Sequence, residues 1–222
     1  MIKVVISGYG RMGHMIEKVL ERRGIELLGA SEDIVNFDRS LAAQSVCIDF
    51  TTPDAFHSNY KAIAENFKAA VVGTTGWNDI KEEVLAYFEK CGTPLVYSSN
   101  FSIGVNVLFA ATQRASELLK GNGYEPHVHE VHHIHKLDAP SGTAKSLGAL
   151  VEAGMGVAPE ITSERIGEVP GTHVVTFESS CDKLTFTHEA YSREGLAEGA
   201  VAAALMTEGL SGVAEFKDLL FK

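Results

Sequence analysis

The sequence predicts an α/β protein in which a doubly wound parallel sheet is followed by a second, smaller α+β domain. Short β-branched runs alternate with helical patterns through roughly the first 100 residues. The runs are continuously apolar, which is typical of parallel strands covered by helices on both faces. After Phe101 the alternation stops, and longer helices and two hairpin-forming runs replace it.

Five strands and three helices are expected in the first part of the chain. Gly24 ends the first helix, since glycine readily takes the left-handed conformation that closes a helix. Thr52 is the expected N-cap of the second helix, because its hydroxyl can accept a backbone N–H, and Pro53 suits the first helical position. The expected strands are residues 4–7, 26–30, 46–50, 70–72 and 95–97, and the expected helices are residues 11–23, 53–67 and 79–90.

The second part of the chain has a different pattern. It is expected to contain helices at residues 103–120 and 141–153, an extended histidine-rich stretch between them, and a glycine-rich loop after them. Residues 172–178 and 184–187 are expected to form a hairpin, and a last helix at residues 193–206 returns to the first domain. Residues 1–102 and 192–222 therefore form the expected first domain, and residues 103–191 form the second.

Charge and composition exclude several classes of function. The net charge of −10 argues against a general nucleic-acid or anionic-membrane surface. No apolar run approaches the ~20 residues that a membrane span needs, and no export signal is recognisable. Three widely spaced cysteines do not suggest a disulfide framework. We therefore expect a soluble, cytoplasmic protein.

A glycine motif lies at the first strand–helix junction. The segment Gly8-Tyr9-Gly10-Arg11-Met12-Gly13 has the pattern Gly-x-Gly-x-x-Gly and leads directly into a helix. In this position the first glycine permits a tight turn, the second lets a pyrophosphate approach, and the third lets helix and strand pack closely. The helix-start N–H groups favour phosphates. The motif predicts dinucleotide binding in a Rossmann-like domain, and a purely structural turn is the alternative.

An acidic residue after the second strand should hold the adenosine ribose. Glu32 and Asp33 stand about 20 residues past the loop, where this acid is expected, and the choice between them stays open. No Lys or Arg follows immediately, and the nearest is Arg39. A 2′-phosphate would meet a carboxylate without compensation, so the sequence favours NADH over NADPH.

Two further loops are expected to lie beside the cofactor. Gly73-Thr74-Thr75-Gly76 follows the fourth strand, and Ser98-Ser99-Asn100-Phe101 follows the fifth. Ligands in open α/β sheets bind at the carboxyl ends of the strands. We expect these loops to form the nicotinamide side of the site, although each could be only a connecting loop.

The segment from Glu130 to Ala144 is rich in chemically active side chains. Together with His127 and His129, it places five of the nine histidines within nine residues. One interpretation is a polar strand, with His127 and His129 on one face. A second is a metal site, but neither cysteine nor the helical His-Glu-x-x-His spacing accompanies the histidines, so we predict no metal.

The favoured interpretation is a pocket for a small acidic substrate. Histidine can donate or accept a proton near neutrality, and Lys136 adds a positive charge. Ser141-Gly142-Thr143 follows Pro140 and opens a helix, whose N–H groups can hold a carboxylate. In a chain of net negative charge, this combination predicts a site for a small dicarboxylate.

These segments resemble the dihydrodipicolinate reductase family, and the resemblance spans nearly the whole chain. The matching segments are Gly10-Arg11-Met12-Gly13, Asp49-Phe50-Thr51, Gly73-Thr74-Thr75-Gly76, residues 100–106, residues 130–144, Val169-Pro170-Gly171-Thr172 and Ser192-Arg193.

The resemblance implies reduction of the conjugated imine ring of dihydrodipicolinate, derived from 4-hydroxy-tetrahydrodipicolinate, to tetrahydrodipicolinate in lysine biosynthesis. It implies that His132 and Lys136 are the proton-transfer pair, and that the chain forms a homotetramer through the sheet of the second domain. The implied substrate-binding residues are His133, Lys136, Ser141, Gly142 and Thr143. The expected cofactor-binding residues are Gly8, Tyr9, Gly10, Arg11, Met12, Gly13, Glu32, Asp33, Gly73, Thr74, Thr75, Ser98, Ser99, Asn100, Phe101 and Arg193.

The chain departs from the family pattern in three places. Its nucleotide loop is one residue shorter, Ile134 stands where many members have Arg, and Thr52 stands where some have Arg. The replacements at positions 134 and 52 each remove a positive charge near the ligands. Two other functions stay open, namely a different NAD-dependent amino- or imino-acid dehydrogenase and a non-catalytic dinucleotide sensor. The segment 130–143 favours the reductase over both alternatives, since neither of them needs its histidine and lysine pattern.

Overall fold

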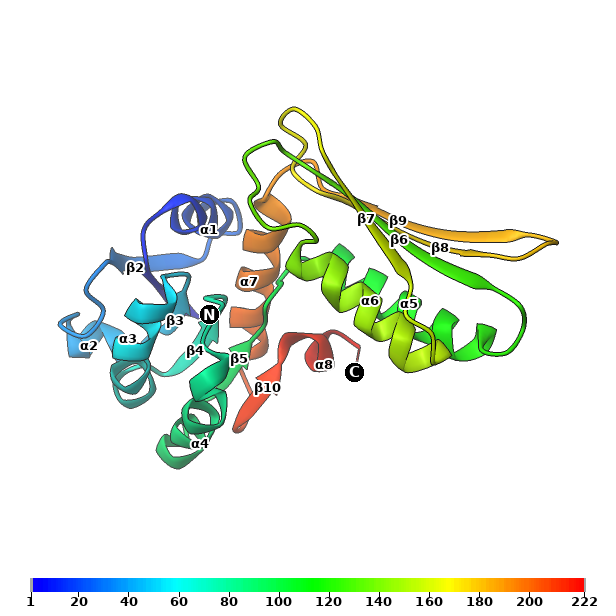
Figure 1. Ribbon diagram of the computed structural model, residues 1–222. Coiled ribbons are helices and arrows are strands. Elements are labelled where there is room, and N and C mark those ends of the chain that lie inside the picture. The colour runs from blue at the N-terminus through cyan, green and yellow to red at the C-terminus, as the bar shows by residue number, and fades with distance from the viewer. Residues whose placement is uncertain (1, 222) are drawn as a thin grey trace. The chain divides into compact units, whose positions relative to one another are not determined.

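The computed structural model describes residues 2–221, which form two compact units (Figure 1). One unit contains the chain up to Ser102 together with the segment from Glu194 onward, and the other contains Ile103–Arg193. No helix among residues 2–221 is long and apolar enough to cross a membrane.

The first unit is a six-stranded parallel sheet with the strand order β10-β5-β4-β3-β1-β2. This confirms the predicted doubly wound fold. The order reverses beside β1, and ligands in such sheets bind at the carboxyl ends of the strands at that point. The strands are β1 (Lys3–Ser7), β2 (Glu26–Ser31), β3 (Val46–Asp49), β4 (Ala69–Val72), β5 (Leu95–Tyr97) and β10 (Val213–Glu215). The helices are α1 (Arg11–Arg22), α2 (Arg39–Ala42), α3 (Pro53–Asn66), the 3-10 helix η1 (Asn78–Ile80), α4 (Lys81–Cys91), α7 (Glu194–Met206) and α8 (Phe216–Leu220).

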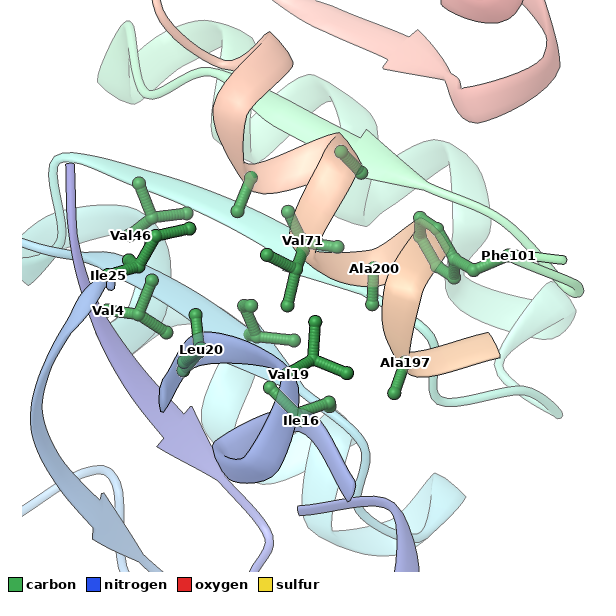
Figure 2. Packing of buried hydrophobic residues seen from close by; sticks show 14 of the residues in the cluster. Val4, Ile16, Val19, Leu20, Ile25, Val46, Val71, Phe101, Ala197 and Ala200 are labelled. Atoms are coloured by element: carbon green, nitrogen blue, oxygen red, sulfur yellow. The ribbon is translucent and has the colours of Figure 1, made fainter. Parts of the chain in front are cut away.

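Both faces of this sheet are apolar because helices cover both. Along β1, Val4 packs into one hydrophobic cluster with α1 and α7, whereas its neighbour Val5 packs into a second cluster with α3 and α4. Figure 2 shows the first cluster, to which Leu20 of α1, Ala200 of α7 and Val71 of β4 all contribute. The chain therefore uses its last long helix to complete the core that its first helix begins.

The N-terminus of α3 is capped as the sequence predicts. Thr52 is the N-cap, and its Oγ1 accepts the N–H of Ala55 at 3.3 Å. Pro53 is the first helical residue. The predicted N-cap is confirmed.

The second unit is a mixed four-stranded sheet with the order β7-β6-β8-β9. Strands β8 and β9 form the predicted antiparallel hairpin, and β6 pairs parallel with β7. Figure 1 shows α5 and α6 together on one side of this sheet. The elements are α5 (Ile103–Leu119), β6 (Glu125–His132), α6 (Gly142–Met155), β7 (Glu160–Arg165), β8 (Thr172–Glu178) and β9 (Lys183–Glu189).

The prediction of a glycine-rich loop without strands after α6 was wrong, because that segment contains the edge strand β7. The sequence of β7 is Glu-Ile-Thr-Ser-Glu-Arg, in which Ile161 is the only apolar residue. An edge strand needs no continuous apolar run, so its composition did not reveal it. Its pairing with β6 brings Ser163 and Arg165 next to the histidine-rich strand.

Strand β6 alternates between the two faces of its sheet. Val128 faces α5 and α6 and packs with Val175 and Phe177 of β8 in the core of the unit. His127 and His129 point to the opposite face and are only partly buried.

Candidate active site

The three glycines of the nucleotide loop have different surroundings. Gly8 has a φ of +84°, and a Cβ there would lie 2.6 Å from the carbonyl oxygen of Phe50. A Cβ on Gly13 would lie 2.5 Å from the carbonyl oxygen of Gly8, whereas a Cβ on Gly10 would meet no atom within 4 Å. The loop is therefore tight at its two ends and open over Gly10, which is the geometry that an approaching pyrophosphate requires.

Glu32 and Asp33 are distinguished by their partners. The Oε1 atom of Glu32 accepts the backbone N–H of Tyr9 at 2.5 Å, so this carboxylate lies beside the glycine loop. The carboxylate of Asp33 instead accepts the side-chain amide of Asn36 at 2.8 Å. Of the two acids, Glu32 is the one placed next to the nucleotide loop.

A buried carboxylate ties together the carboxyl ends of three strands. Asp49 accepts the hydroxyl of Ser7 at 2.6 Å and the hydroxyl of Thr74 at 2.5 Å. Burial raises the pKa of Asp49, and the hydrogen bonds from Ser7, Thr74 and Thr51 oppose that rise. The side chain of Thr74 is therefore buried in the scaffold, and Thr75 is the exposed hydroxyl of that loop.

The loop after β5 is held by its own hydrogen bonds. Ser98 Oγ accepts the N–H of Asn100 at 3.1 Å, and Asn100 Oδ1 accepts the N–H of Ser102 at 2.9 Å. The ring of Phe101 is buried against Phe216, with 4.9 Å between ring centroids. A ligand could reach Phe101 only through its backbone. Two other expected cofactor residues are exposed, Ser99 in this loop and Arg193 directly before α7.

The five clustered histidines do not form one site. His127 and His129 each lie 3.7 Å from a glutamate of β7, on the sheet face opposite to His132. His135 is exposed and pairs with Glu168 at 3.2 Å. His133 follows the end of β6 and is partly buried. His132 alone of the five joins the buried polar cluster described next.

That cluster surrounds Glu130, which is fully buried. Its Oε1 accepts the N–H of Ser141 at 2.9 Å, the hydroxyl of Ser163 at 2.9 Å and Nη2 of Arg165 at 3.1 Å. Burial would raise the pKa of Glu130, but the hydrogen bonds led by Ser141 outweigh it and lower that pKa to about 2. Glu130 is therefore ionised throughout the neutral range.

Two buried imidazoles face the other oxygen of Glu130. Its Oε2 lies 3.3 Å from His132 Nδ1 and 3.7 Å from His173 Nε2. Burial lowers the pKa of His132, and the charge of Glu130 partly offsets this. Burial and the neighbouring His132 lower the pKa of His173 to about 4. Both rings are therefore neutral at neutral pH.

Lys136 and the start of α6 lie on the loop that follows β6. Lys136 Nζ lies 2.8 Å from Asp138 and lowers the pKa of that carboxyl. Ser141 is the N-cap of α6, since its Oγ accepts the N–H of Ala144 at 3.2 Å. Gly142 is exposed, and a Cβ there would meet no atom within 4 Å. Helix-start amides and an ammonium group are the components expected of a carboxylate site.

Glu130, His132 and His173 also satisfy one criterion for a metal site. Their potential ligand atoms lie within 4.8 Å of one another. However, Oε1 of Glu130 already has three donors, and one of them is the guanidinium of Arg165. A cation already bound to the same carboxylate disfavours a second one, so the donor set fits a hydrogen-bonded cluster better than a metal centre.

Sequence reasoning assigned no role to Glu130, Arg165, His173 or Asp49. One signal was available for Glu130, since residues two apart on a strand share a face and His132 was already a candidate. His173 lay within a correctly predicted strand. Its meeting with His132 depends on the pairing of Glu130 with His173 between β6 and β8, which the sequence does not encode locally.

Two protein-family models match the chain along nearly its whole length. The model described as the N-terminus of dihydrodipicolinate reductase matches residues 2–101, and the model of its C-terminus matches residues 104–220. The 4-hydroxy-tetrahydrodipicolinate reductase of Christiangramia forsetii is 37% identical, over 99% of this chain and 98% of the relative. The 4-hydroxy-tetrahydrodipicolinate reductase of Methanopyrus kandleri is 34% identical, over 98% of this chain and 96% of the relative.

Solved structures support the fold. A dipicolinate-bound dihydrodipicolinate reductase from Paenisporosarcina sp. TG-14 has a TM-score of 0.83 at 18% identity, covering 98% of this chain and 99% of the other. An engineered D-amino acid dehydrogenase bound to NADP+ has a TM-score of 0.57 at 13% identity, covering 99% of this chain and 95% of the other. At these identities the likeness concerns architecture alone.

Proposed function

This chain belongs to the dihydrodipicolinate reductase family, and from that premise we propose how its residues carry out the reaction. The family consists of NAD(P)H-dependent oxidoreductases that act on a cyclic imine dicarboxylate in diaminopimelate and lysine biosynthesis. The proposed reaction reduces dihydrodipicolinate, derived from 4-hydroxy-tetrahydrodipicolinate, to tetrahydrodipicolinate. The observation that carries the assignment of roles is that one short segment brings them together: His132 ends β6, Lys136 lies in the loop that follows, and α6 starts where this loop ends.

The first unit would hold the cofactor. When bound, the reduced nicotinamide supplies a hydride, which no side chain can provide. The open space over Gly10 and the helix-start amides of α1 suit the pyrophosphate. Glu32 suits the adenosine ribose. The residues of this unit proposed to contact the cofactor are those of the glycine loop, Glu32, Gly73, Thr75, Ser98, Ser99, Asn100 and the backbone of Phe101. Arg193, the last residue of the second unit, is a further proposed contact.

The second unit would hold the dicarboxylate. Gly142 and Thr143, at the start of α6, are proposed to bind one carboxylate, because a helix start favours an anion. Ser141 is buried and its hydroxyl bonds to Ala144 and His173, so it is proposed to hold this helix start in place. Lys136 and His133 can neutralise the other. His132 is proposed to exchange the proton that the reduced ring needs, with Lys136 as its partner.

Oxidation of NADH in the presence of freshly prepared imine substrate tests this function. We expect turnover with that substrate and none with simple amino acids and NAD+. A dinucleotide sensor would bind NADH without oxidising it. An amino-acid dehydrogenase would instead turn over an amino acid with NAD+ and would not act on the imine substrate.

We propose that NADH is preferred over NADPH, because the carboxylate of Glu32 would repel a 2′-phosphate. Replacing Glu32 with alanine is expected to lower kcat/KM for NADH about tenfold through loss of a hydrogen bond worth about 1–2 kcal/mol. The activity with NADPH should not fall. Initial-rate kinetics with both cofactors measure this, and Asp33→Ala is the matched control. A wild-type KM that is much lower for NADPH would contradict the charge argument.

We propose that the chain forms a homotetramer through the face of the second sheet opposite to α5 and α6. Val174 lies at the middle of β8 on this face, paired with His129 and with Thr187. Val174→Arg should dissociate the tetramer, because a symmetric interface brings like charges together. Light scattering measures the mass of the assembly, and Val157→Arg at an exposed loop position is the control. An unchanged tetramer in Val174→Arg would place the interface elsewhere.

We also propose a cytoplasmic location. The three cysteines, Cys47, Cys91 and Cys181, are all free thiols, which suits a reducing compartment. Cell fractionation with an activity assay tests this proposal.

A further inference from the structure

We propose that Glu130 is a positioning residue that fixes the tautomer of His132, so that His132 exchanges its proton with the substrate through Nε2. This inference rests on the proposed proton-transfer role of His132. It assigns a function to the buried carboxylate that lies beside that histidine and touches neither ligand in the proposed mechanism.

The orientation of the Glu130 carboxylate is fixed by donors on one side. All three partners of Oε1 donate a hydrogen bond, and the peptide N–H of Ser141 and the guanidinium of Arg165 have no ability to accept one. Oε1 is therefore fully used, and only Oε2 is available to the imidazoles.

Oε2 then determines which nitrogen of His132 carries the proton. An ionised carboxylate oxygen only accepts hydrogen bonds, so the ring nitrogen that faces it must be protonated. Nδ1 of His132 lies 3.3 Å from Oε2, and neither atom makes a hydrogen bond to any residue among 2–221, the contact between the two included. Leaving both unpaired in a buried site would be costly. The neutral ring therefore carries its proton on Nδ1, and Nε2 is the atom that gains and loses a proton.

The backbone beside Nε2 of His132 carries no side chain. Gly171 lies next to this atom, and a Cβ at that position would lie 3.0 Å from Nε2 and 3.3 Å from Cδ2 of His132. A side chain at position 171 would therefore press against the reactive edge of the ring. Glycine avoids that contact.

Glu130 also sustains the basicity of His132. Burial lowers the pKa of His132, and most of the charged or titratable groups around it lower that pKa further. Glu130 is the neighbour that raises it. The groups that lower it are Lys136, Arg165 and His133. His173, which contacts the ring edge with 5.0 Å between centroids, lies on the same side of Glu130. Removal of the carboxylate charge should therefore make His132 harder to protonate.

The test is Glu130→Gln, which keeps the shape of the side chain. Since every partner of Oε1 donates, the amide oxygen should take the Oε1 position, and the NH₂ group should then face His132 Nδ1. Nδ1 would have to accept, and the neutral ring would switch to the Nε2–H tautomer. We expect kcat to fall about 100-fold with KM for NADH within twofold of wild type. The decline of kcat at high pH should move down by about one pH unit, because the acid loses its proton earlier.

Two measurements separate this role from a purely structural one. Nitrogen-15 NMR of histidine-labelled protein at pH 8 should show Nδ1–H for His132 in the wild type and Nε2–H in Glu130→Gln. Glu168→Gln is the matched control, because Glu168 faces the exposed His135 at 3.2 Å, and its kcat and pH profile should be unchanged. Thermal unfolding and NADH binding establish that each variant is folded.

Each result decides the inference. Nε2–H in the wild type would overturn it, even if Glu130→Gln failed to fold. Wild-type kcat and pH profile in a folded Glu130→Gln would also overturn it. If His132→Ala is inactive while Glu130→Gln is normal, only this inference fails. If His132→Ala is active, the proposed function of His132 fails first.

Discussion

His132→Ala should lower kcat by a factor of about 100 to 10,000 while NADH still binds with its wild-type affinity, since a positioned acid or base contributes this much to a proton transfer. His132 is buried next to Glu130 in the second unit, whereas the proposed pyrophosphate contacts lie at the glycine loop of the first unit. Lys136→Ala should cause a comparable loss in kcat and also raise KM for the dicarboxylate, because its ammonium would both neutralise the substrate and assist the proton transfer.

The measurement is NADH oxidation with saturating imine, beside fluorescence titration of NADH binding. His127→Ala is the control for His132, because it lies on the same strand but on the opposite face. Lys183→Ala, whose ammonium pairs with Glu178 at 2.8 Å, is the control for Lys136. Normal turnover in both His132→Ala and Lys136→Ala would refute the assignment of roles, even with the reaction itself correct.

The second large effect concerns stability. Gly199 lies in α7, where a Cβ would come within 1.7 Å of the carbonyl oxygen of Phe101. That oxygen belongs to the backbone and cannot rotate away, so Gly199→Ala must displace α7 from the segment after β5. Figure 2 shows Phe101 beside Ala197 and Ala200 of the same helix. We expect the free energy of unfolding to fall by about 3 kcal/mol, which is at the upper end for overpacked variants. This corresponds to a fall in Tm of about 6–12 °C.

Gly195→Ala provides a matched control within the same helix. A Cβ on Gly195 would meet only Ser102 Oγ, at 3.8 Å, which is an ordinary contact. Alanine has a higher helix propensity than glycine, so Gly195→Ala should leave Tm unchanged or raise it slightly. Thermal unfolding followed by circular dichroism compares the two. A Tm within 2 °C of wild type for Gly199→Ala would show that α7 is not packed as tightly as the structure indicates.

The sequence by itself determined the parts of the protein that depend on local pattern. The β-branched runs and the Thr52 cap predicted the parallel sheet and its helices, because residues close in the chain set strand and helix periodicity. The glycine motif predicted the nucleotide loop for the same reason. The family likewise followed from ordered segments such as residues 130–144.

The tertiary structure decided the arrangement of side chains that come from different strands. A one-residue change in strand register moves every side chain to the other face of the sheet, and no local pattern fixes the partner of a strand. For this reason the meeting of Glu130 with Arg165 and His173 became visible only in the paired strands β6, β7 and β8. The alternation of side chains along β6, which extends as far as His132, separated His132 from His127 and His129.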